Sequence, residues 1–365
     1  MPSTPTSTRA WIVANYPKGL PTFTVPEGDA NANATFKLVE RPLPALGPEQ
    51  VLVKTLFLSN DPAQRVGIEP SIPPERLYTP PVKLNETMSA LGLGEVIAST
   101  AASLPVGSIV YTRPGWTEYA VLDAAACQPR TPLPNGLSIT HYLGAFGGPG
   151  LTAYYGLVVI GEAKQGMRVV VSGAAGATGS MVVQVAKNIV GCSQVIGIAG
   201  SDEKCRWVES LGADICLNYR RATFEQDLVK ATDGFVDVFF DNVGGHILDL
   251  MLARLKRNGV AVACGSISAY NSQEPTVLKN YFQVITMRLS IRGFIVMDHL
   301  AKASETLELY SRAVQEGKLK ISDANEQVVP TRFEDIPKTW LRLFEGGNTG
   351  KLVTKLIRIE NNIIL

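Results

Sequence analysis

A glycine-bearing turn between two apolar runs is the feature that most constrains how this chain can fold. Residues 169–171 are three consecutive valines, as is typical of a buried parallel strand. Gly173, Gly176 and Gly179 follow, then apolar residues at helical spacing, and residues 195–199 form a second apolar run. This order predicts a strand–helix–strand unit whose turn could accept a pyrophosphate, because the free N–H groups of a helix start attract anions. The G-x-x-G-x-x-G spacing departs from the usual dinucleotide motif, so the pattern alone also fits a tight turn without a ligand.

Strands and helices alternate through the rest of the second half of the chain. We expect strands at 168–172, 195–199, 236–240, 260–264 and 289–294, and helices at 203–211, 224–231, 247–255 and 276–284. Two further helices are expected at 300–317 and 333–344, and a terminal strand at 351–357. This alternation predicts a doubly wound parallel sheet, in which ligands bind at the carboxyl ends of the strands. Small or polar residues follow three of these strands, which favours a dinucleotide site there over plain loops.

The first 145 residues have a different character. They contain short strand patterns at 36–39, 51–58, 93–98, 109–112 and 117–122, separated by frequent prolines. This composition predicts a small β-barrel or sandwich rather than a helical domain. Residues 69–81 include five prolines and are expected to form an extended loop that could cover a cleft.

Charge and cysteine content exclude several classes of protein. A formal net charge of +1 over 365 residues gives no electrostatic reason to expect nucleic acid or an anionic membrane surface as a partner. No apolar stretch is long enough to span a bilayer. Five cysteines without a C-x-x-C pair indicate a reduced, cytoplasmic protein rather than a disulfide scaffold. No histidine or cysteine spacing matches a zinc site, so no metal is expected.

The end of the second strand indicates which dinucleotide is bound. Sites for NAD usually place an Asp or Glu there, where it holds the ribose hydroxyls. Here the strand ends in Ala199, Gly200 and Ser201, and Lys204 follows. A hydroxyl and a cation suit a 2′-phosphate, and the missing carboxylate removes a repulsion, so we favour NADP(H) over NAD. Lys204 would otherwise be an ordinary solvated lysine.

Eight short motifs occur together, in order, from about residue 10 to the C-terminus. They are DPxxR (61–65), GGPGLTAYYGL (147–157), AAGATG (174–179), AGSxEK (199–204), FDNVGG (240–245), CGSISxYN (264–271), RGFIV (292–296) and GxNxGK (346–351). As a set they resemble a branch of the medium-chain dehydrogenase/reductase superfamily, the zinc-independent prostaglandin reductases and alkenal double-bond reductases.

The resemblance implies an α/β fold with two domains and a bound cofactor. A GroES-like β-barrel domain would span 1–145 and be completed by about 325–365, and a Rossmann domain would span 146–324. The resemblance also implies NADP(H), a homodimer, and a small enone or enal as substrate. The cofactor contacts expected are Gly176, Ala177, Thr178, Gly179, Ser201, Lys204, Tyr219, Asn242, Cys264, Ser266, Ser268, Tyr270, Phe294, Ile295, Val296 and Asn348.

The substrate side is expected in the barrel domain. Asn60 and Arg65 match the family's loop by position, and Tyr78 lies in the proline-rich segment. Ala63 and Gln64 stand where many members of the family carry a Tyr and a Met, so we expect substrate specificity to differ here.

The implied reaction reduces a carbon–carbon double bond conjugated to a carbonyl. Hydride adds to the β-carbon and negative charge develops on the carbonyl oxygen, which therefore needs a hydrogen-bond donor. Tyr270 is our candidate for this donor. Alternatively, Tyr270 only packs on the cofactor, and a ribose hydroxyl or a water is the donor. Tyr281 and Tyr78 are weaker candidates. Two other functions remain open on this fold: a zinc-independent ketone reductase or alcohol dehydrogenase, and a non-catalytic NADPH-binding protein.

Overall fold

The chain folds into two compact units, and each is described by itself. The computed structural model describes residues 4–24 and 31–357. The first unit comprises Met1–Leu143, Val328–Gly347 and Leu352–Leu365, and the second comprises Gly144–Gln327 and Asn348–Lys351. The barrel domain expected at 1–145 and 325–365 includes residues 1–3, 25–30 and 358–365, which lie outside the described residues.

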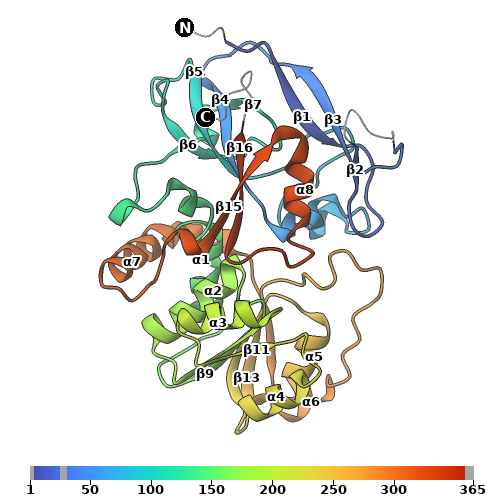
Figure 1. Cartoon of the computed structure of the whole chain (residues 1–365), viewed down its shortest axis with the longest axis vertical. Helices are drawn as coiled ribbons and strands as arrows, with labels where there is room; N and C mark the ends of the chain where they lie inside the picture. Colours follow the sequence, from blue (N-terminus) through green and yellow to red (C-terminus); the bar gives the residue numbers. More distant parts are fainter. Residues whose placement is uncertain (1–3, 25–30, 358–365) are drawn as a thin grey trace. The chain divides into compact units, whose positions relative to one another are not determined.

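The first unit is built from two β-sheets. One sheet has the strand order β15-β16-β4-β5-β6-β8, with β7 pairing β4, and the other has the order β1-β3-β2 (Figure 1). The strands are β1 (Ser7–Val13), β2 (Phe23–Thr24), β3 (Phe36–Pro42), β4 (Gln50–Ser59), β5 (Gly92–Ser99), β6 (Ile109–Thr112), β7 (Tyr119–Asp123), β8 (Gln128–Pro129), β15 (Glu326–Arg332) and β16 (Lys351–Ile357). All five strands predicted in this part of the sequence are confirmed, as is the terminal strand. Strand β1 was not expected from the sequence, because only its pairing along the whole of β3 identifies it as a strand.

The C-terminal return of the chain completes the core of the first unit. Helix α8 (Ile336–Leu341) carries Trp340, whose ring lies 5.6 Å from that of Trp116 and 5.9 Å from that of Phe36, centroid to centroid. Burial of such large aromatic side chains contributes much of the stability of a small barrel, so this helix belongs to the core although it is distant in sequence.

The second unit contains a six-stranded parallel sheet with the order β11-β10-β9-β12-β13-β14. Its strands are β9 (Arg168–Val171), β10 (Gln194–Ala199), β11 (Ile215–Asn218), β12 (Val236–Asp241), β13 (Leu255–Ala263) and β14 (Ser290–Gly293). The predicted doubly wound sheet is confirmed, with one strand more than expected. Strand β11 has only four residues, ICLN, too few for a pattern that distinguishes a strand from a loop.

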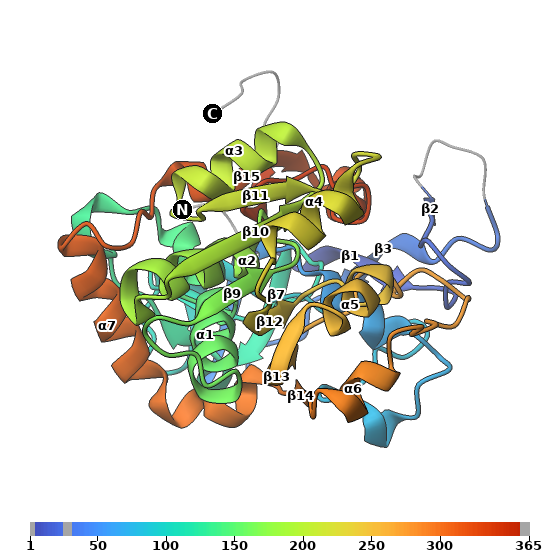
Figure 2. The same cartoon turned by 90° about the horizontal axis from the view of Figure 1, so that it is seen from below.

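Helices connect these strands on both faces of the sheet. They are α1 (Gly148–Tyr154), η6 (Tyr155–Ile160), α2 (Ala177–Gln184), η7 (Val185–Val190), α3 (Asp202–Ser210), α4 (Phe224–Ala231), α5 (Gly245–Leu252), α6 (Phe282–Thr286) and α7 (Ala303–Gln315). Figure 2 shows α1 and α2 on one side of the strands and α4 and α5 on the other. The helix predicted at 276–284 is wrong in position, because only Phe282–Thr286 is helical there.

The sheet order fixes where a ligand can bind. Strands β9 and β12 lie in the middle of the sheet and are buried throughout or nearly so, as their apolar sequences predict. The chain order reverses between β9 and β12, since β10 and β11 lie on one side and β13 and β14 on the other. In such sheets the carboxyl ends of the strands around the reversal point form the ligand site.

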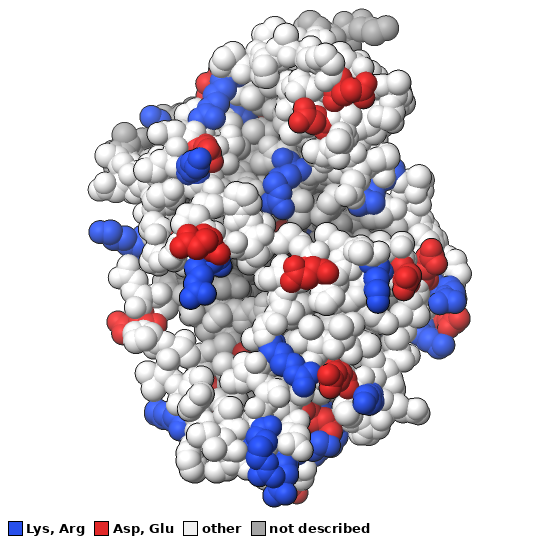
Figure 3. Space-filling model, turned by 180° about the vertical axis from the view of Figure 1, so that it is seen from behind, with Lys and Arg blue, Asp and Glu red and all other residues white. Residues whose placement is uncertain are grey.

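Charged side chains of both signs are interspersed over the face drawn in Figure 3. No helix within residues 4–24 and 31–357 is both long enough and apolar enough to cross a membrane.

Candidate functional site

The glycine turn after β9 is shaped by contacts that exclude side chains. A Cβ atom on Gly179 would lie 2.2 Å from the carbonyl oxygen of Gly173, and Gly173 itself has a φ of +57°. A Cβ on Gly176 would lie 3.3 Å from the same oxygen, so this position is less crowded. Helix α2 begins directly after Gly176, so Ala177 and Thr178 supply N–H groups that have no acceptor within the helix. This geometry fits a phosphate at the helix start.

Two other segments of the second unit form hydrogen bonds with residues of this turn. The Asn242 side chain donates to the carbonyl oxygen of Ser172 over 2.7 Å, which places it beside Gly173. The N–H of Gly350 donates to the carbonyl oxygen of Ala175 over 2.8 Å. Asn348 in turn donates to the carbonyl oxygen of Gly350 over 2.9 Å. Asn242 and Asn348, expected from the sequence as cofactor contacts, are therefore both brought to the glycine turn.

Asp241 organises the loop that follows β12. Its carboxylate accepts hydrogen bonds from the Ser172 hydroxyl at 2.7 Å and from the N–H groups of Val243 and Gly244 at 3.0 Å. Burial raises the pKa of Asp241, and these donors partly offset that rise. The FDNVGG motif contained this residue, but sequence reasoning assigned only the Asn, because a motif does not show which of its side chains bonds its own loop.

A basic corner lies at the tip of β10. The Ser201 hydroxyl caps helix α3 by accepting the N–H of Lys204 at 3.2 Å. A Cβ on Gly200 would lie 3.1 Å from the hydroxyl oxygen of Tyr219, so the Tyr219 ring occupies the place that a carboxylate side chain would need. The pKa of Lys204 is lowered by burial first and by the charge of Arg220 second. The corner therefore joins the predicted Ser201, Lys204 and Tyr219 with Arg220, a cation that sequence reasoning missed.

The loop after β13 places a neutral hydroxyl and thiol near the sheet. The N–H of Ser266 donates to the Tyr270 hydroxyl oxygen over 3.3 Å, and Ser268 donates to the carbonyl oxygen of Val243 over 2.6 Å. Burial raises the pKa of Tyr270 and raises that of the Cys264 thiol to about 12. Tyr270 therefore keeps its proton near neutral pH. The Tyr270 oxygen already accepts a hydrogen bond, and this polarises the O–H group and makes it a stronger donor.

Residues 294–296 follow the edge strand β14. The Phe294 ring lies 6.5 Å from that of Phe240, and a Cβ on Gly156 would lie 2.5 Å from the Phe294 ring. The ring thus packs against other residues of the second unit, and Phe294, Ile295 and Val296 are all half-buried. A cofactor contact by this segment stays a prediction, and we expect it to come from the backbone or from Ile295 and Val296.

The structure gives two of the expected substrate residues structural contacts in the first unit. Asn60 is 2% exposed and donates to the Thr354 hydroxyl at 3.0 Å, which ties β4 to β16. Arg65, also 2% exposed, pairs with Glu69 at 3.0 Å and donates to the Pro17 carbonyl oxygen at 3.4 Å. This burial does not support substrate contact by Asn60 or Arg65, since each side chain is enclosed by its own unit. Tyr78, the third candidate, is exposed.

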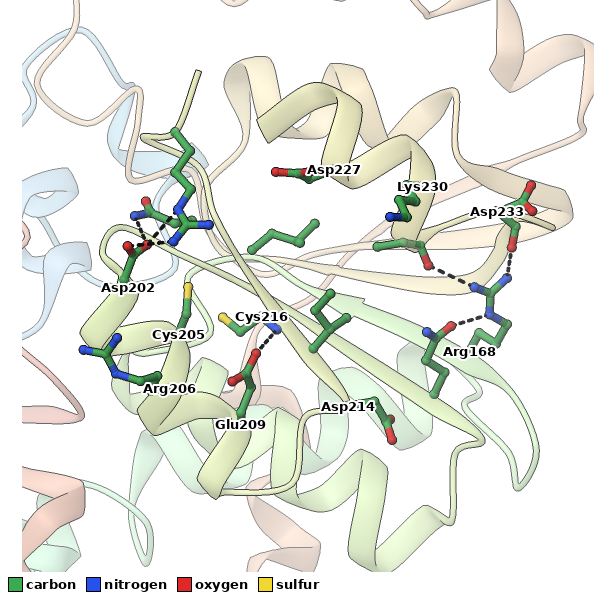
Figure 4. Close-up of a pocket in the computed structure, with 16 residues that line it drawn as sticks. Arg168, Asp202, Cys205, Arg206, Glu209, Asp214, Cys216, Asp227, Lys230 and Asp233 are labelled. Carbon is green, nitrogen blue, oxygen red and sulfur yellow. Dashed lines mark hydrogen bonds and ion pairs between the residues drawn. The ribbon is translucent and has the colours of Figure 1, made fainter. Parts of the chain in front are cut away.

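A hollow of about 790 Å³ lies along the free edge of β11 and is drawn in Figure 4. Several of its charged side chains are engaged with the protein itself: Arg168 donates to the carbonyl oxygen of Asp233, and Asp202 pairs with Arg221 at 2.8 Å. The Glu209 carboxylate accepts the N–H of Cys216 at 2.9 Å and so covers the strand edge. We therefore do not regard this hollow as the functional site, which lies at the strand tips.

A metal site needs several histidine, cysteine, aspartate or glutamate side chains close together. No group of three or more such side chains is placed to hold a metal ion within the part of the chain that the structure describes.

Two family models match the chain. Residues 9–129 match the N-terminal domain of oxidoreductase, and residues 177–312 match the zinc-binding dehydrogenase family. Together the two matches cover parts of both units and agree with the observed two-unit α/β fold.

Individual relatives match along nearly the whole chain. Prostaglandin reductase 1 of Bos taurus is 32% identical over 351 residues, covering 95% of this chain and 98% of the relative. The NADPH-dependent curcumin reductase of Escherichia coli is 32% identical over 365 residues, covering 95% and 96%. The uncharacterized membrane protein YML131W of Saccharomyces cerevisiae is 33% identical over 362 residues, covering 95% and 98%.

Solved structures show the same fold. CurA from Vibrio vulnificus, in complex with NADPH, superposes with a TM-score of 0.84 at 31% sequence identity, covering 96% of this chain and 99% of that one. The similarity thus extends through both units, in sequence and in three dimensions. The chain belongs to the zinc-independent medium-chain dehydrogenase/reductases of the prostaglandin reductase type.

Proposed function

We propose that this protein is an NADP(H)-dependent oxidoreductase that reduces the carbon–carbon double bond of an α,β-unsaturated carbonyl compound. The observation that carries the cofactor assignment is the corner at the tip of β10, where Lys204 and Arg220 stand and Tyr219 fills the place of a carboxylate. The names of the relatives, a prostaglandin reductase and an NADPH-dependent curcumin reductase, support the same cofactor and reaction.

Different strand tips carry residues that suit different parts of a dinucleotide. The start of α2 at Gly176–Gly179 would hold the pyrophosphate, and Ser201, Lys204 and Tyr219 would hold the 2′-phosphate end. Asn242 and Asn348 lie beside the glycine turn, and the loop from Cys264 to Tyr270 would lie toward the nicotinamide.

The chemistry requires a hydride and a proton donor of suitable strength. Bound NADPH would supply the hydride to the β-carbon of the substrate. Charge then develops on the carbonyl oxygen, and a preorganised hydroxyl that donates to this oxygen lowers the barrier. Tyr270 suits this role because burial keeps it protonated and the Ser266 N–H fixes its oxygen. A proton from a water or from the hydroxyl itself would then add to the α-carbon of the enolate and complete the saturated product.

An assay with three matched substrates tests this function. The purified protein is incubated with NADPH and 4-phenyl-3-buten-2-one, with NADPH and the saturated 4-phenyl-2-butanone, and with NADP⁺ and 4-phenyl-2-butanol. We expect NADPH oxidation with the enone alone, and mass spectrometry should show the saturated ketone as product. Turnover of the saturated ketone or the alcohol without turnover of enones would overturn the proposal in favour of a carbonyl reductase. Cofactor binding without turnover of a panel of enones would favour a non-catalytic protein.

We further infer that the protein forms a homodimer through the edge strand β14. Among the described strands β14 pairs only with β13, so its other edge is open to a second copy. Exposed apolar side chains gather around it: Phe282 is 67% exposed, Ile285 62% and Ile291 41%. An identical strand in antiparallel orientation would cover this edge and these side chains across a two-fold axis.

Sedimentation of a charged variant tests the dimer. Ile291→Lys places a charge on the open edge and should convert the dimer to a monomer at micromolar concentration. Val229→Lys is the matched control, because Val229 is also an exposed apolar residue, 52% against 41% for Ile291, and lies on α4; this variant should leave the sedimentation coefficient unchanged. A wild-type protein that sediments as a monomer would disprove the inference.

A further inference from the structure

We propose that Arg220 is a second cation for the 2′-phosphate and acts together with Lys204 in selecting NADPH. This inference rests on the proposed NADP(H) dependence and deepens it. Neither the motifs of the chain nor its resemblance to the family assigned a role to Arg220, which lies in the turn after β11.

The turn that carries Arg220 is fixed against the start of α3. The backbone N–H of Arg220 donates to the Asn218 side chain at 3.0 Å, and the Asn218 amide donates to Asp202 at 2.7 Å. The Arg220 guanidinium carbon lies 5.8 Å from the centre of the Tyr219 ring. Since the Tyr219 hydroxyl lies against Gly200, the ring links Arg220 to the strand tip that precedes Ser201.

The charges in this corner repel each other. Lys204 is half-buried, and the positive charge of Arg220 lowers the pKa of the lysine further, an effect that the smaller, opposite influence of Glu203 offsets only in part. Holding two cations together costs free energy unless an anion lies near both of them. A phosphate dianion on the 2′-oxygen is such an anion. It would accept charge-assisted hydrogen bonds from both side chains.

The neighbouring arginine has a different task. Arg221 makes a two-pronged ion pair with Asp202, with Nε–Oδ1 at 3.0 Å and Nη2–Oδ2 at 2.8 Å. This pair engages the Arg221 guanidinium and neutralises an acidic side chain that directly follows Ser201. Arg220 and Arg221 are therefore adjacent in the chain and both exposed, but Arg221 pairs with Asp202 whereas Arg220 lies near the Tyr219 ring.

That difference provides a matched pair of variants. Binding of adenosine 2′,5′-bisphosphate and of 5′-AMP to the full-length protein is measured by isothermal titration calorimetry, which needs no turnover. Arg220→Gln should weaken binding of the bisphosphate about tenfold and that of 5′-AMP less than about twofold, as expected for one charge-assisted hydrogen bond. Arg221→Gln removes the same charge and leaves the Asp202 carboxylate with its hydrogen bond from Asn218. Because this guanidinium is already engaged by Asp202, we expect bisphosphate binding to weaken, but by less than about threefold. Arg220→Lys keeps the charge and should recover part of the affinity.

The outcomes separate this inference from the proposed function. Equal losses for Arg220→Gln and Arg221→Gln would indicate a general positive field and would overturn the role of Arg220. The same conclusion follows if Lys204→Gln weakens bisphosphate binding while Arg220→Gln does not, and the NADP(H) assignment would then stand. If the wild-type protein binds the bisphosphate no more tightly than 5′-AMP, both the cofactor assignment and the role of Arg220 fail.

Discussion

The two ends of the strand-tip site use different chemistry. At the tip of β10 the side chains are cationic and partly exposed, with Lys204 half-buried and Arg220 at the surface. At the loop after β13 the polar groups are uncharged, because burial raises the pKa values of Tyr270 and Cys264 and keeps both protonated.

The difference matches what each end is proposed to do. A phosphate dianion keeps its charge throughout the reaction, so fixed cations near water can bind it without being altered by the chemistry. A carbonyl oxygen gains charge only in the transition state, and a neutral donor in a water-poor site stabilises that change selectively. In the proposed function, cationic side chains therefore contribute to cofactor affinity at one end, whereas a protonated hydroxyl contributes to the reaction rate at the other.

The turn that joins the two ends should be the most sensitive position. In Gly179→Ala the new Cβ would lie 2.2 Å from the Gly173 carbonyl oxygen, and backbone must move to relieve the clash. We expect a loss of about 2–4 kcal/mol in the free energy of unfolding and loss of both cofactor affinity and turnover. Gly176→Ala, with a Cβ 3.3 Å from the same oxygen, is the control and should lose less than about 1 kcal/mol. Urea unfolding measures the free energy of unfolding of both variants. Equal values for Gly179→Ala and Gly176→Ala would show that the turn adjusts to the added methyl group.

A change at the uncharged end should affect the rate. Tyr270→Phe removes the proposed donor while keeping the ring, so kcat should fall about 100-fold with the KM for NADPH within about twofold. Steady-state kinetics with an enone measures both constants. If the KM for NADPH rises and kcat is kept, Tyr270 packs against the cofactor and the proposed contrast between the two ends is wrong.

A change at the cationic end should affect cofactor choice. Lys204→Ala should raise the KM for NADPH about tenfold, leave that for NADH within about twofold, and leave kcat nearly unchanged, because the proposed contact of the lysine is with the 2′-phosphate alone. The ratio of kcat/KM for NADPH to that for NADH is the measurement. An equal loss with both cofactors would assign Lys204 to a general structural role.

Local patterns predicted much of the second unit. The bounds of α4, Phe224–Ala231, and those of the terminal strand agree with the expected ones, because amphipathic spacing and apolar runs report burial directly. The strand β11 and the shortened helix α6 were not predicted well, since four residues carry too little pattern and the segment before Phe282 is held by long-range contacts.

The candidate site was only partly predictable for the same reason. Motif positions indicated Lys204, Ser201 and Asn242, but position alone also suggested Asn60 and Arg65, whose side chains are buried in structural hydrogen bonds. Asp241 and Arg220 gave no signal of their own, because their roles depend on which groups face them across the fold.

The glycine turn, the parallel sheet and the missing carboxylate at the end of β10 could all be predicted from the amino-acid sequence. Spacing and residue type suffice for these, since backbone sterics and hydrophobic burial act over a few neighbouring residues. The tertiary structure was needed to show that Asp202 holds Arg221, whereas the adjacent Arg220 faces the Tyr219 ring at the tip of β10. Charge and hydrogen bonding act between groups close in space, and their distances are set by the pairing of strands far apart in the chain.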